Sequence, residues 1–298
     1  MRDQFAGDIS DLLKFSFLRS LAGPGAQLGI AWYFVEGPNG RNDGRHREFC
    51  TEEKWKNLDE HVWKALSCLK DLTIKGLEES GVLPPETVFY REPVPKRADR
   101  AGWASIMQRK LATCDLVFLD PDNGLGRSTP RHATIEELKR FCDGGRAVVF
   151  IQFPARRNHE QQAQRLHQQL IEGTNASDVF TLSTCVRIGG VPRMRWFTLV
   201  NGSQMVMDRA EKYADVLRHI VGCRARIYSR SSLGPNVIAS TQVIEAVGKK
   251  CPECAKEFRG PGYLGIDAHW KANHLDVMPY EAAWALIRQD LYPDRGKL

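Results

Sequence analysis

An apolar run in the middle of the chain ends in a cluster of polar residues. Residues 116–124 read LVFLDPDNG, so Asp120, Asp122 and Asn123 follow four apolar residues at once. Carboxylates accept hydrogen bonds and stabilise positive charge, and an amide both donates and accepts. An aspartate before glycine can also simply cap a turn. Since a cap uses only one carboxylate, the pair favours a site of chemistry at the end of a buried strand.

Two other loops carry polar and basic residues in comparable places. Residues 36–46 read EGPNGRNDGRH, and residues 154–159 read PARRNH. In open α/β sheets, ligands bind at the carboxyl ends of the strands. We therefore expect the three loops to surround one cleft. The side chains expected there, in catalysis or in binding a sugar or phosphate, are Asp43, Arg45, His46, Arg127, Arg156 and Arg157.

The elements that would position these loops alternate between strands and helices. The expected strands are residues 28–35, 87–90, 115–119, 147–153, 178–186 and 195–200. The expected helices are residues 9–21, 52–80, 100–112, 134–142, 159–172 and 208–221, and a short β-like pair is expected around 233–236. Apolar strands separated by helices predict a three-layer α/β/α domain with a mainly parallel sheet. We place this catalytic domain at residues 1–245.

The C-terminal region, residues 246–298, has the spacing of a two-cysteine, two-histidine zinc finger. Cys251 and Cys254 are followed after 14 residues by His269 and then by His274. Two thiolates from one tight turn and two imidazoles from a helix complete a tetrahedron around zinc. Four protein ligands close the site, so the expected zinc is structural. Flanking lysines and arginines favour contact between this finger and nucleic acid.

Composition and charge narrow the classes of protein further. The 298 residues are 42% apolar and 26% charged, and no uninterrupted apolar run reaches membrane-spanning length. The acidic start MRDQFAGDISD is unlike a signal peptide, so we expect a cytoplasmic protein. The net charge of +6 is modest, but loop arginines in clusters suit phosphate contacts.

The N-terminal segment GDISDLLKF places Asp8, Asp11 and Lys14 at three-residue intervals on one helix. It resembles the GNxxDVLKH start of a family of ribosomal RNA adenine methyltransferases, whose catalytic loop also follows an apolar strand. That resemblance implies S-adenosylmethionine-dependent methyl transfer. The chain departs from the pattern, because it has no GxG after the first strand and no aromatic residue after Asp120 and Pro121.

Two further reactions fit the acidic residues. Several carboxylates near a phosphate-binding surface could hold Mg²⁺ for a nuclease, although the lysine of PD-x-(D/E)-x-K nucleases is missing. LDPDNG is also similar to the first motif of uracil-DNA glycosylases, in which an Asp-Pro pair at a strand end activates water. Asp122 and Asn123 replace the aromatic residue and histidine of that family, and no HPSP-like second motif follows.

The combination of GDxxDxLKF, DGRH and LVFLDPDNGL resembles phage-defence DNA glycosylases that remove glucosylated hydroxymethylcytosine. This resemblance covers residues 7–125 and implies excision of a modified base from double-stranded phage DNA, with no organic cofactor. Asp120 is then expected to stabilise the oxocarbenium-like sugar at a cleft, with Asp8 and Asp43 as further catalytic candidates and Lys14 in substrate binding. Asp122 and Asn123 are expected to read the flipped base. A non-catalytic DNA-binding protein is the alternative.

Overall fold

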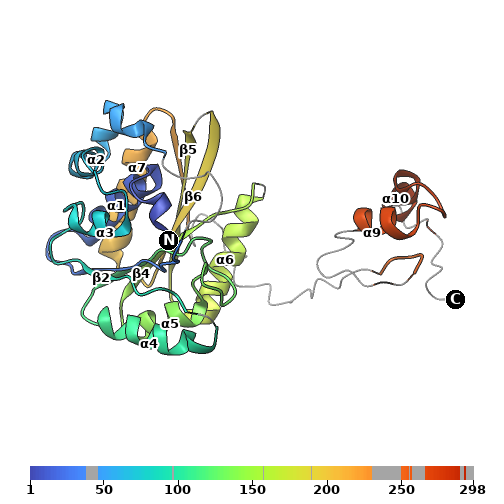
Figure 1. Cartoon of the computed structure of the whole chain (residues 1–298), viewed down its shortest axis with the longest axis horizontal. Coiled ribbons are helices and arrows are strands. Elements are labelled where there is room, and N and C mark those ends of the chain that lie inside the picture. The colour runs from blue at the N-terminus through green and yellow to red at the C-terminus, as the bar shows by residue number, and fades with distance from the viewer. Residues whose placement is uncertain are drawn as a thin grey trace. The chain divides into compact units, whose positions relative to one another are not determined.

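The computed structural model describes two compact units. The described residues are 1–37, 46–95, 97–156, 158–188, 190–229, 250–254, 256, 266–288 and 292. Contacts divide the chain into Met1–Ala239 and Ser240–Leu298, and both units are drawn in Figure 1. The expected domain boundary at 245/246 and the expected β-like pair around 233–236 lie outside the described residues.

The first unit is built on a mixed seven-stranded sheet with the order β2-β1-β3-β4-β6-β5-β7. Its strands are β1 (Leu28–Ala31), β2 (Val88–Tyr90), β3 (Leu116–Leu119), β4 (Ala147–Gln152), β5 (Val179–Ile188), β6 (Val191–Val200) and β7 (Cys223–Tyr228). The first four strands pair in parallel, in a register that aligns Ala31 with both Tyr90 and Leu119. The ends of β2, β1 and β3 therefore meet at one edge of the sheet.

The other half of the sheet is antiparallel, so the sheet is mixed where a mainly parallel one was expected. β6 pairs antiparallel with β4 and with β5, and β7 pairs antiparallel with β5. Only residues 189–190, both glycines, separate β5 from β6. A two-residue glycine connection is typical of a hairpin, which must be antiparallel. β7 was missed at the sequence level, because its six residues CRARIY include two arginines.

Helices cover both faces of the sheet, which confirms the three layers (Figure 1). One face packs on α1 (Ile9–Ala22), α2 (Glu60–Ser67), α3 (Ile74–Glu79) and α7 (Gln204–His219) in a single apolar cluster. The opposite face packs on α4 (Arg100–Lys110), α5 (Ile135–Asp143) and α6 (His159–Thr174) in a second cluster. Neighbouring strand residues alternate between the clusters, as Phe118 and Leu119 do.

The region expected as one helix over 52–80 is broken into shorter pieces. It contains the 3-10 helix η3 (Glu53–Asn57), then α2 and α3, after a first 3-10 turn η2 (Glu48–Thr51). Asp59 accepts a hydrogen bond from the Val62 N–H, and Thr73 accepts one from the Gly76 N–H. Each side chain caps a new helix, so the segment restarts twice instead of continuing.

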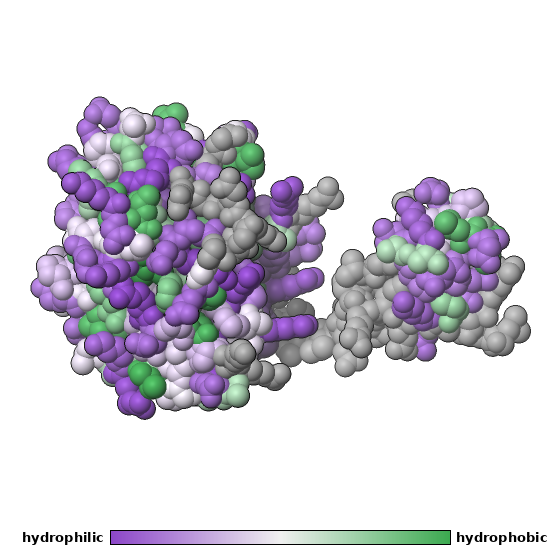
Figure 2. Space-filling model, viewed as in Figure 1, coloured by the Kyte–Doolittle hydropathy of each residue, from purple (hydrophilic) through white to green (hydrophobic). Residues whose placement is uncertain are grey.

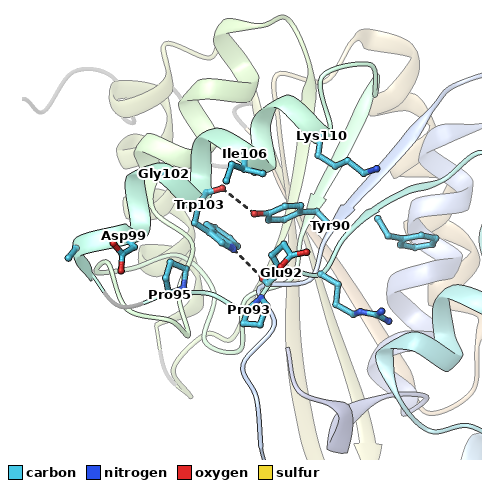
Figure 3. A pocket seen from close by; sticks show the side chains of 12 residues that line it. Tyr90, Glu92, Pro93, Pro95, Asp99, Gly102, Trp103, Ile106 and Lys110 are labelled. Carbon is cyan, nitrogen blue, oxygen red and sulfur yellow. Dashed lines mark hydrogen bonds between the residues drawn. The ribbon is translucent and has the colours of Figure 1, made fainter.

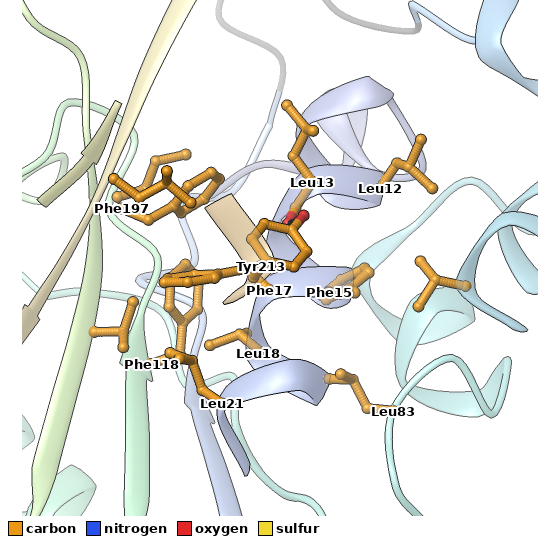
Figure 4. Packing of buried hydrophobic residues seen from close by; sticks show 14 of the residues in the cluster. Leu12, Leu13, Phe15, Phe17, Leu18, Leu21, Leu83, Phe118, Phe197 and Tyr213 are labelled. Atoms are coloured by element: carbon orange, nitrogen blue, oxygen red, sulfur yellow. Dashed lines mark hydrogen bonds between the residues drawn. The ribbon is translucent and has the colours of Figure 1, made fainter. Parts of the chain in front are cut away.

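α1 is the most deeply buried helix of this unit and fixes the N-terminal polar residues in place. Its apolar side chains pack around the sheet and α7, with Phe17 against Phe197 and Tyr213 (Figure 4). Lys14 lies within the same helix and is only 2% exposed. A buried charge costs several kcal/mol unless it is paired, so Lys14 must find partners inside the protein.

The second unit has a small core of its own. α9 (Ile266–Asn273) and α10 (Tyr280–Arg288) are its described helices, and Trp270, Ala283 and Ile287 are buried between them. The Trp270 indole N–H donates to the Met278 carbonyl 3.0 Å away. α10 therefore packs on α9.

The surface of the first unit seen in Figure 2 is mostly hydrophilic, with apolar residues scattered singly. Among the described residues, no helix combines the length and apolar character needed to cross a membrane.

Candidate functional site

The DPDNG loop begins at the end of β3 and rests on α1. Asp120 is 3% exposed, and its carboxylate accepts a hydrogen bond from Lys14 Nζ at 2.8 Å. Lys14 Nζ also donates to Asp11 Oδ1 at 2.6 Å, and Asp11 Oδ2 accepts from the Gly7 N–H at 2.7 Å. The structure thus brings together GDISDLLK and DPDNG. We name the buried residues Asp11, Lys14 and Asp120 the lysine cluster.

Burial and charge act in opposite directions in the lysine cluster. Burial alone lowers the pKa of Lys14, but Asp11 and Asp120 outweigh it, so the pKa rises above its ordinary 10.5. Burial raises the pKa of Asp120, and Lys14 and the Met1 amine oppose that rise. The lysine therefore stays charged at neutral pH and is shared by two carboxylates. Asp120 supports the loop from beneath, and its expected role at the sugar in a cleft stays a prediction.

Asp122 is held by the start of the chain. Its two carboxylate oxygens lie 2.9 Å from the Met1 amine and 3.3 Å from Arg2 Nε. The Met1 amine also donates to the carbonyls of Tyr33 and Asp120. The carboxylates of Asp11, Asp120 and Asp122 thus lie beside three basic groups, which are the Lys14 amine, the Met1 amine and the Arg2 guanidinium. Asp122 is therefore partnered within the protein rather than open to a base.

The rest of the loop is rigid, and Asn123 projects from it. Gly124 has φ +78°, and a Cβ there would lie 2.0 Å from Gln152 Oε1. That oxygen instead accepts the Leu125 N–H at 2.7 Å, so only glycine fits. The Asn123 N–H donates to the Arg131 carbonyl, whereas its side chain is exposed. Asn123 is therefore the side chain of this loop that a ligand can reach.

The remaining expected site residues are distributed less compactly. Asp8 caps α1 by accepting from the Ser10 N–H at 2.7 Å, and the His46 carbonyl accepts from the Ile9 N–H. Arg127 and Arg156 are exposed, as a phosphate contact requires. Three expected site residues lie outside the described residues: Asp43, Arg45 and Arg157.

Sequence reasoning missed a buried arginine beside α1. Arg195 on β6 is 6% exposed, and its Nε donates to Ser10 Oγ. Its Nη1 is one of two buried side-chain polar atoms without a partner among the described residues. Buried polar atoms are nearly always paired, by water if not by protein. An arginine inside the β-rich run RMRWFTLV was the signal in the sequence that could have found it.

Tyr33, the second residue after β1, adopts a backbone conformation that bulky residues rarely use. Its φ is +48°, and its side chain is fully buried. The hydroxyl donates to Glu137 Oε2 at 2.8 Å, and Glu137 binds Arg100 through both oxygens. Left-handed conformations of such residues persist only where the surroundings enforce them, and they cluster at functional sites. At Tyr33 the buried hydrogen bond to Glu137 helps to hold this conformation.

A cavity of about 840 Å³ lies between the end of β2 and α4. Trp103 forms the inner wall (Figure 3), and its ring packs edge-on against Tyr33 and tilted by 58° against Tyr90. Glu92 and Asp99 line the same space. We name this cavity the β2 pocket. Neither the pocket nor its residues were predicted from the sequence, because they come from an edge strand, the loop after it and one side of α4.

A basic groove lies on the antiparallel half of the sheet. It measures about 600 Å³ and is lined by Arg218, Arg224 and Arg226 together with His159. Arg226 lies 3.6 Å from Glu160, at exposed positions of both side chains. Exposed arginines along a groove suit a phosphate backbone.

In the second unit the four predicted ligands converge. The ligand atoms of Cys251, Cys254, His269 and His274 all lie within 4.8 Å of one another. Cys254 Sγ lies 3.3 Å from His269 Nε2, and Cys251 Sγ lies 3.6 Å from His274 Nε2. This cluster could hold a metal ion. The sequence spacing therefore predicted a real spatial cluster.

Comparisons with known proteins add little to this geometry. No model of a protein family matches the chain, and the curated proteins gave no match. Among solved structures, a DUF519 protein from Legionella pneumophila strain Philadelphia 1 aligns with a TM-score of 0.45 and 11% identity. The alignment covers 76% of this chain and 98% of that one. A TM-score of this size is too low to establish a shared fold.

Proposed function

We propose that the protein is a DNA glycosylase that excises a modified base, in keeping with its resemblance to phage-defence glycosylases of glucosylated hydroxymethylcytosine. One observation carries the proposal: the DPDNG loop, held from beneath by the lysine cluster, presents the exposed Asn123 at the carboxyl edge of the sheet. Ligands of open α/β sheets bind at this edge. The basic groove and the exposed Arg127 and Arg156 support DNA as the partner.

The proposed reaction assigns different roles to the loop residues. Asn123 reads the flipped base and orients a water molecule through its amide. Oxygen of this water bonds to the sugar C1′ as the N-glycosidic bond breaks, and one water proton ends on the departing base. Asp120 acts as a positioning residue, because its pairing with Lys14 fixes the loop. The sugar left behind is an abasic site.

We also propose that the Cys/His cluster binds zinc. Two thiolates and two imidazoles are the donor set that zinc prefers in structural sites, and four protein ligands leave no open position. The ion would stabilise the second unit and would take no part in the reaction. Contact between this unit and DNA follows as a proposal from its basic flanking residues.

Base excision can be tested by incubating the full chain with glucosylated phage DNA and with unmodified phage DNA. Alkali-labile sites are then measured in both DNAs. We expect abasic sites only in the glucosylated DNA, and their loss in Asn123→Ala. The matched control is Asn57→Ala, at an exposed position far from Asn123 in the sequence. Loss of DNA binding together with activity in Asn123→Ala would contradict the assigned role. If no abasic sites form while DNA binding persists, the non-catalytic alternative is favoured.

Methyl transfer to a base is the second candidate. The specific observation in its favour is the 2.8 Å contact between Lys14 and Asp120, which joins the two segments that resemble adenine methyltransferases. Incorporation of label from S-adenosylmethionine into nucleic acid, without abasic sites, would replace base excision by this reaction.

A further inference from the structure

The β2 pocket has the composition of a site for a sugar ring. Tyr90 and Trp103 are 5% and 7% exposed, and their polar atoms are satisfied within the protein. The Trp103 indole N–H donates to the Glu92 carbonyl at 3.1 Å, and the Tyr90 hydroxyl donates to the Trp103 carbonyl at 3.3 Å. The rings therefore present apolar faces to the cavity (Figure 3). Such walls with few polar groups are typical of small-ligand pockets.

Two carboxylates supply the polar groups. Glu92 and Asp99 are exposed, line the pocket, and have no salt-bridge partner among the described residues. Glu92 lies close enough to Tyr90 to join burial in raising the pKa of that hydroxyl to about 12. An ionised carboxylate only accepts hydrogen bonds. A ligand of the β2 pocket must therefore offer hydrogen-bond donors, and sugar hydroxyl groups are such donors.

Basic residues around the pocket do not change this preference. Arg91 is paired with Glu78 at 3.0 Å, so its positive charge is already balanced. Lys110 lines the pocket at the end of α4 opposite Asp99 (Figure 3). Phosphate near Glu92 and Asp99 would meet two negative charges. A neutral, hydroxyl-rich ring resting on an apolar aromatic wall fits better.

The geometry points to the β2 pocket as a binding site for a sugar ring, with its hydroxyl groups on Glu92 and Asp99 and its apolar face toward Trp103. Position supports this, because β2 lies next to β1 at the edge where nucleoside sugars contact acidic residues in other open α/β sheets. The sugar could belong to a glucosylated base or to a nucleoside. This inference stands apart from the proposed function, since it concerns binding alone.

Calorimetric titration of the full chain tests the proposal with two probes. Glucosylated 5-hydroxymethyldeoxycytidine represents the modified base, and adenosine represents a nucleoside. Their controls are 5-hydroxymethyldeoxycytidine and 2′,3′-dideoxyadenosine, which lack the relevant hydroxyl groups. We expect one probe to bind and its control to bind at least about tenfold more weakly, because each lost hydrogen bond to a charged group removes that much affinity. The probe that binds identifies the source of the sugar.

Variants locate the binding. The double substitution Glu92→Gln and Asp99→Asn should weaken binding of the active probe about tenfold or more. Glu86→Gln, an exposed glutamate just before β2, is the matched control and should leave it unchanged. Binding of neither probe, or equal affinity of the double variant and the parent chain, overturns the proposal. Base excision could still be observed in that case, so the two failures are distinguishable.

Discussion

The two polar clusters of this protein differ in what satisfies them. In the lysine cluster, Lys14 lies within hydrogen-bonding distance of both Asp11 and Asp120, so protein groups alone balance the charges. In the Cys/His cluster, each thiol lies close to an imidazole, and the two imidazoles lie close to each other. The first cluster is complete without an added ion, whereas the second has the composition of a cation site. Their responses to substitution and to chelation should differ accordingly.

The largest expected effect is the unfolding of the second unit when its metal ion is removed. Structural zinc sites contribute on the order of 10 kcal/mol to folding, and the core around Trp270 is small. We expect a zinc chelator, or Cys251→Ser, to unfold this unit and leave the first unit folded, as measured by amide NMR. Cys68→Ser, at an exposed cysteine of the first unit, is the control. If the second unit stays folded in the presence of the chelator, the Cys/His cluster does not differ from the lysine cluster in needing a metal ion.

Removal of the buried lysine should have the next largest effect. Lys14→Met leaves two carboxylates buried without their cation, which should lower the free energy of unfolding by about 3–5 kcal/mol in urea titrations. Lys139→Met breaks an exposed pair with Asp143 and should change it by less than about 1 kcal/mol. If Asp120→Asn partly rescues Lys14→Met, the loss comes from charge. Equal effects of the two lysine variants would show that the cluster is not a buried charge network.

Acid should affect the first unit through a histidine outside both clusters. Burial lowers the pKa of His167 to about 4, and its Nε2 lies 2.9 Å from Thr181 Oγ1. The unfolded chain binds the proton near pH 6.5 and the folded chain near pH 4, so this stability is present above 6.5 and is lost as the pH falls to 4. We expect a loss of about 3 kcal/mol across that window.

Urea titrations of the parent chain and of His167→Gln at pH 6.5 and 4.5 measure the contribution of this histidine. The variant should show a shallower pH dependence than the parent. Identical pH dependence would place the acid sensitivity elsewhere, for example in the carboxylates of the lysine cluster.

The smallest stability effect is expected at the residue that we consider most important for the reaction. Asn123→Ala removes an exposed side chain, so the free energy of unfolding should change by less than about 0.5 kcal/mol. Base excision should nevertheless be lost. A large destabilisation in thermal unfolding would show that Asn123 supports the loop, as Asp120 does, rather than facing the ligand.

Local patterns determined much of this molecule before any tertiary contact was known. Apolar runs such as LVFL predicted the parallel strands, because burial on both faces requires apolar residues throughout. The CxxC and histidine spacing predicted the Cys/His cluster, because one tight turn places both thiols and one helix places both imidazoles. The glycine pair at 189–190 in the sequence also signalled the antiparallel half, although the prediction of a mainly parallel sheet did not use it.

Only the tertiary structure decided how the polar residues are used. The types and spacing of Asp120 and Asp122 indicated chemistry equally well, but burial beneath α1 pairs one with Lys14, and the chain start pairs the other with Arg2. The β2 pocket likewise depends on Trp103 meeting Tyr90 across separate elements. Electrostatic pairing and solvent access depend on distances between segments that are far apart in the sequence. Local sequence patterns therefore indicated which residues matter, and tertiary packing determined their roles.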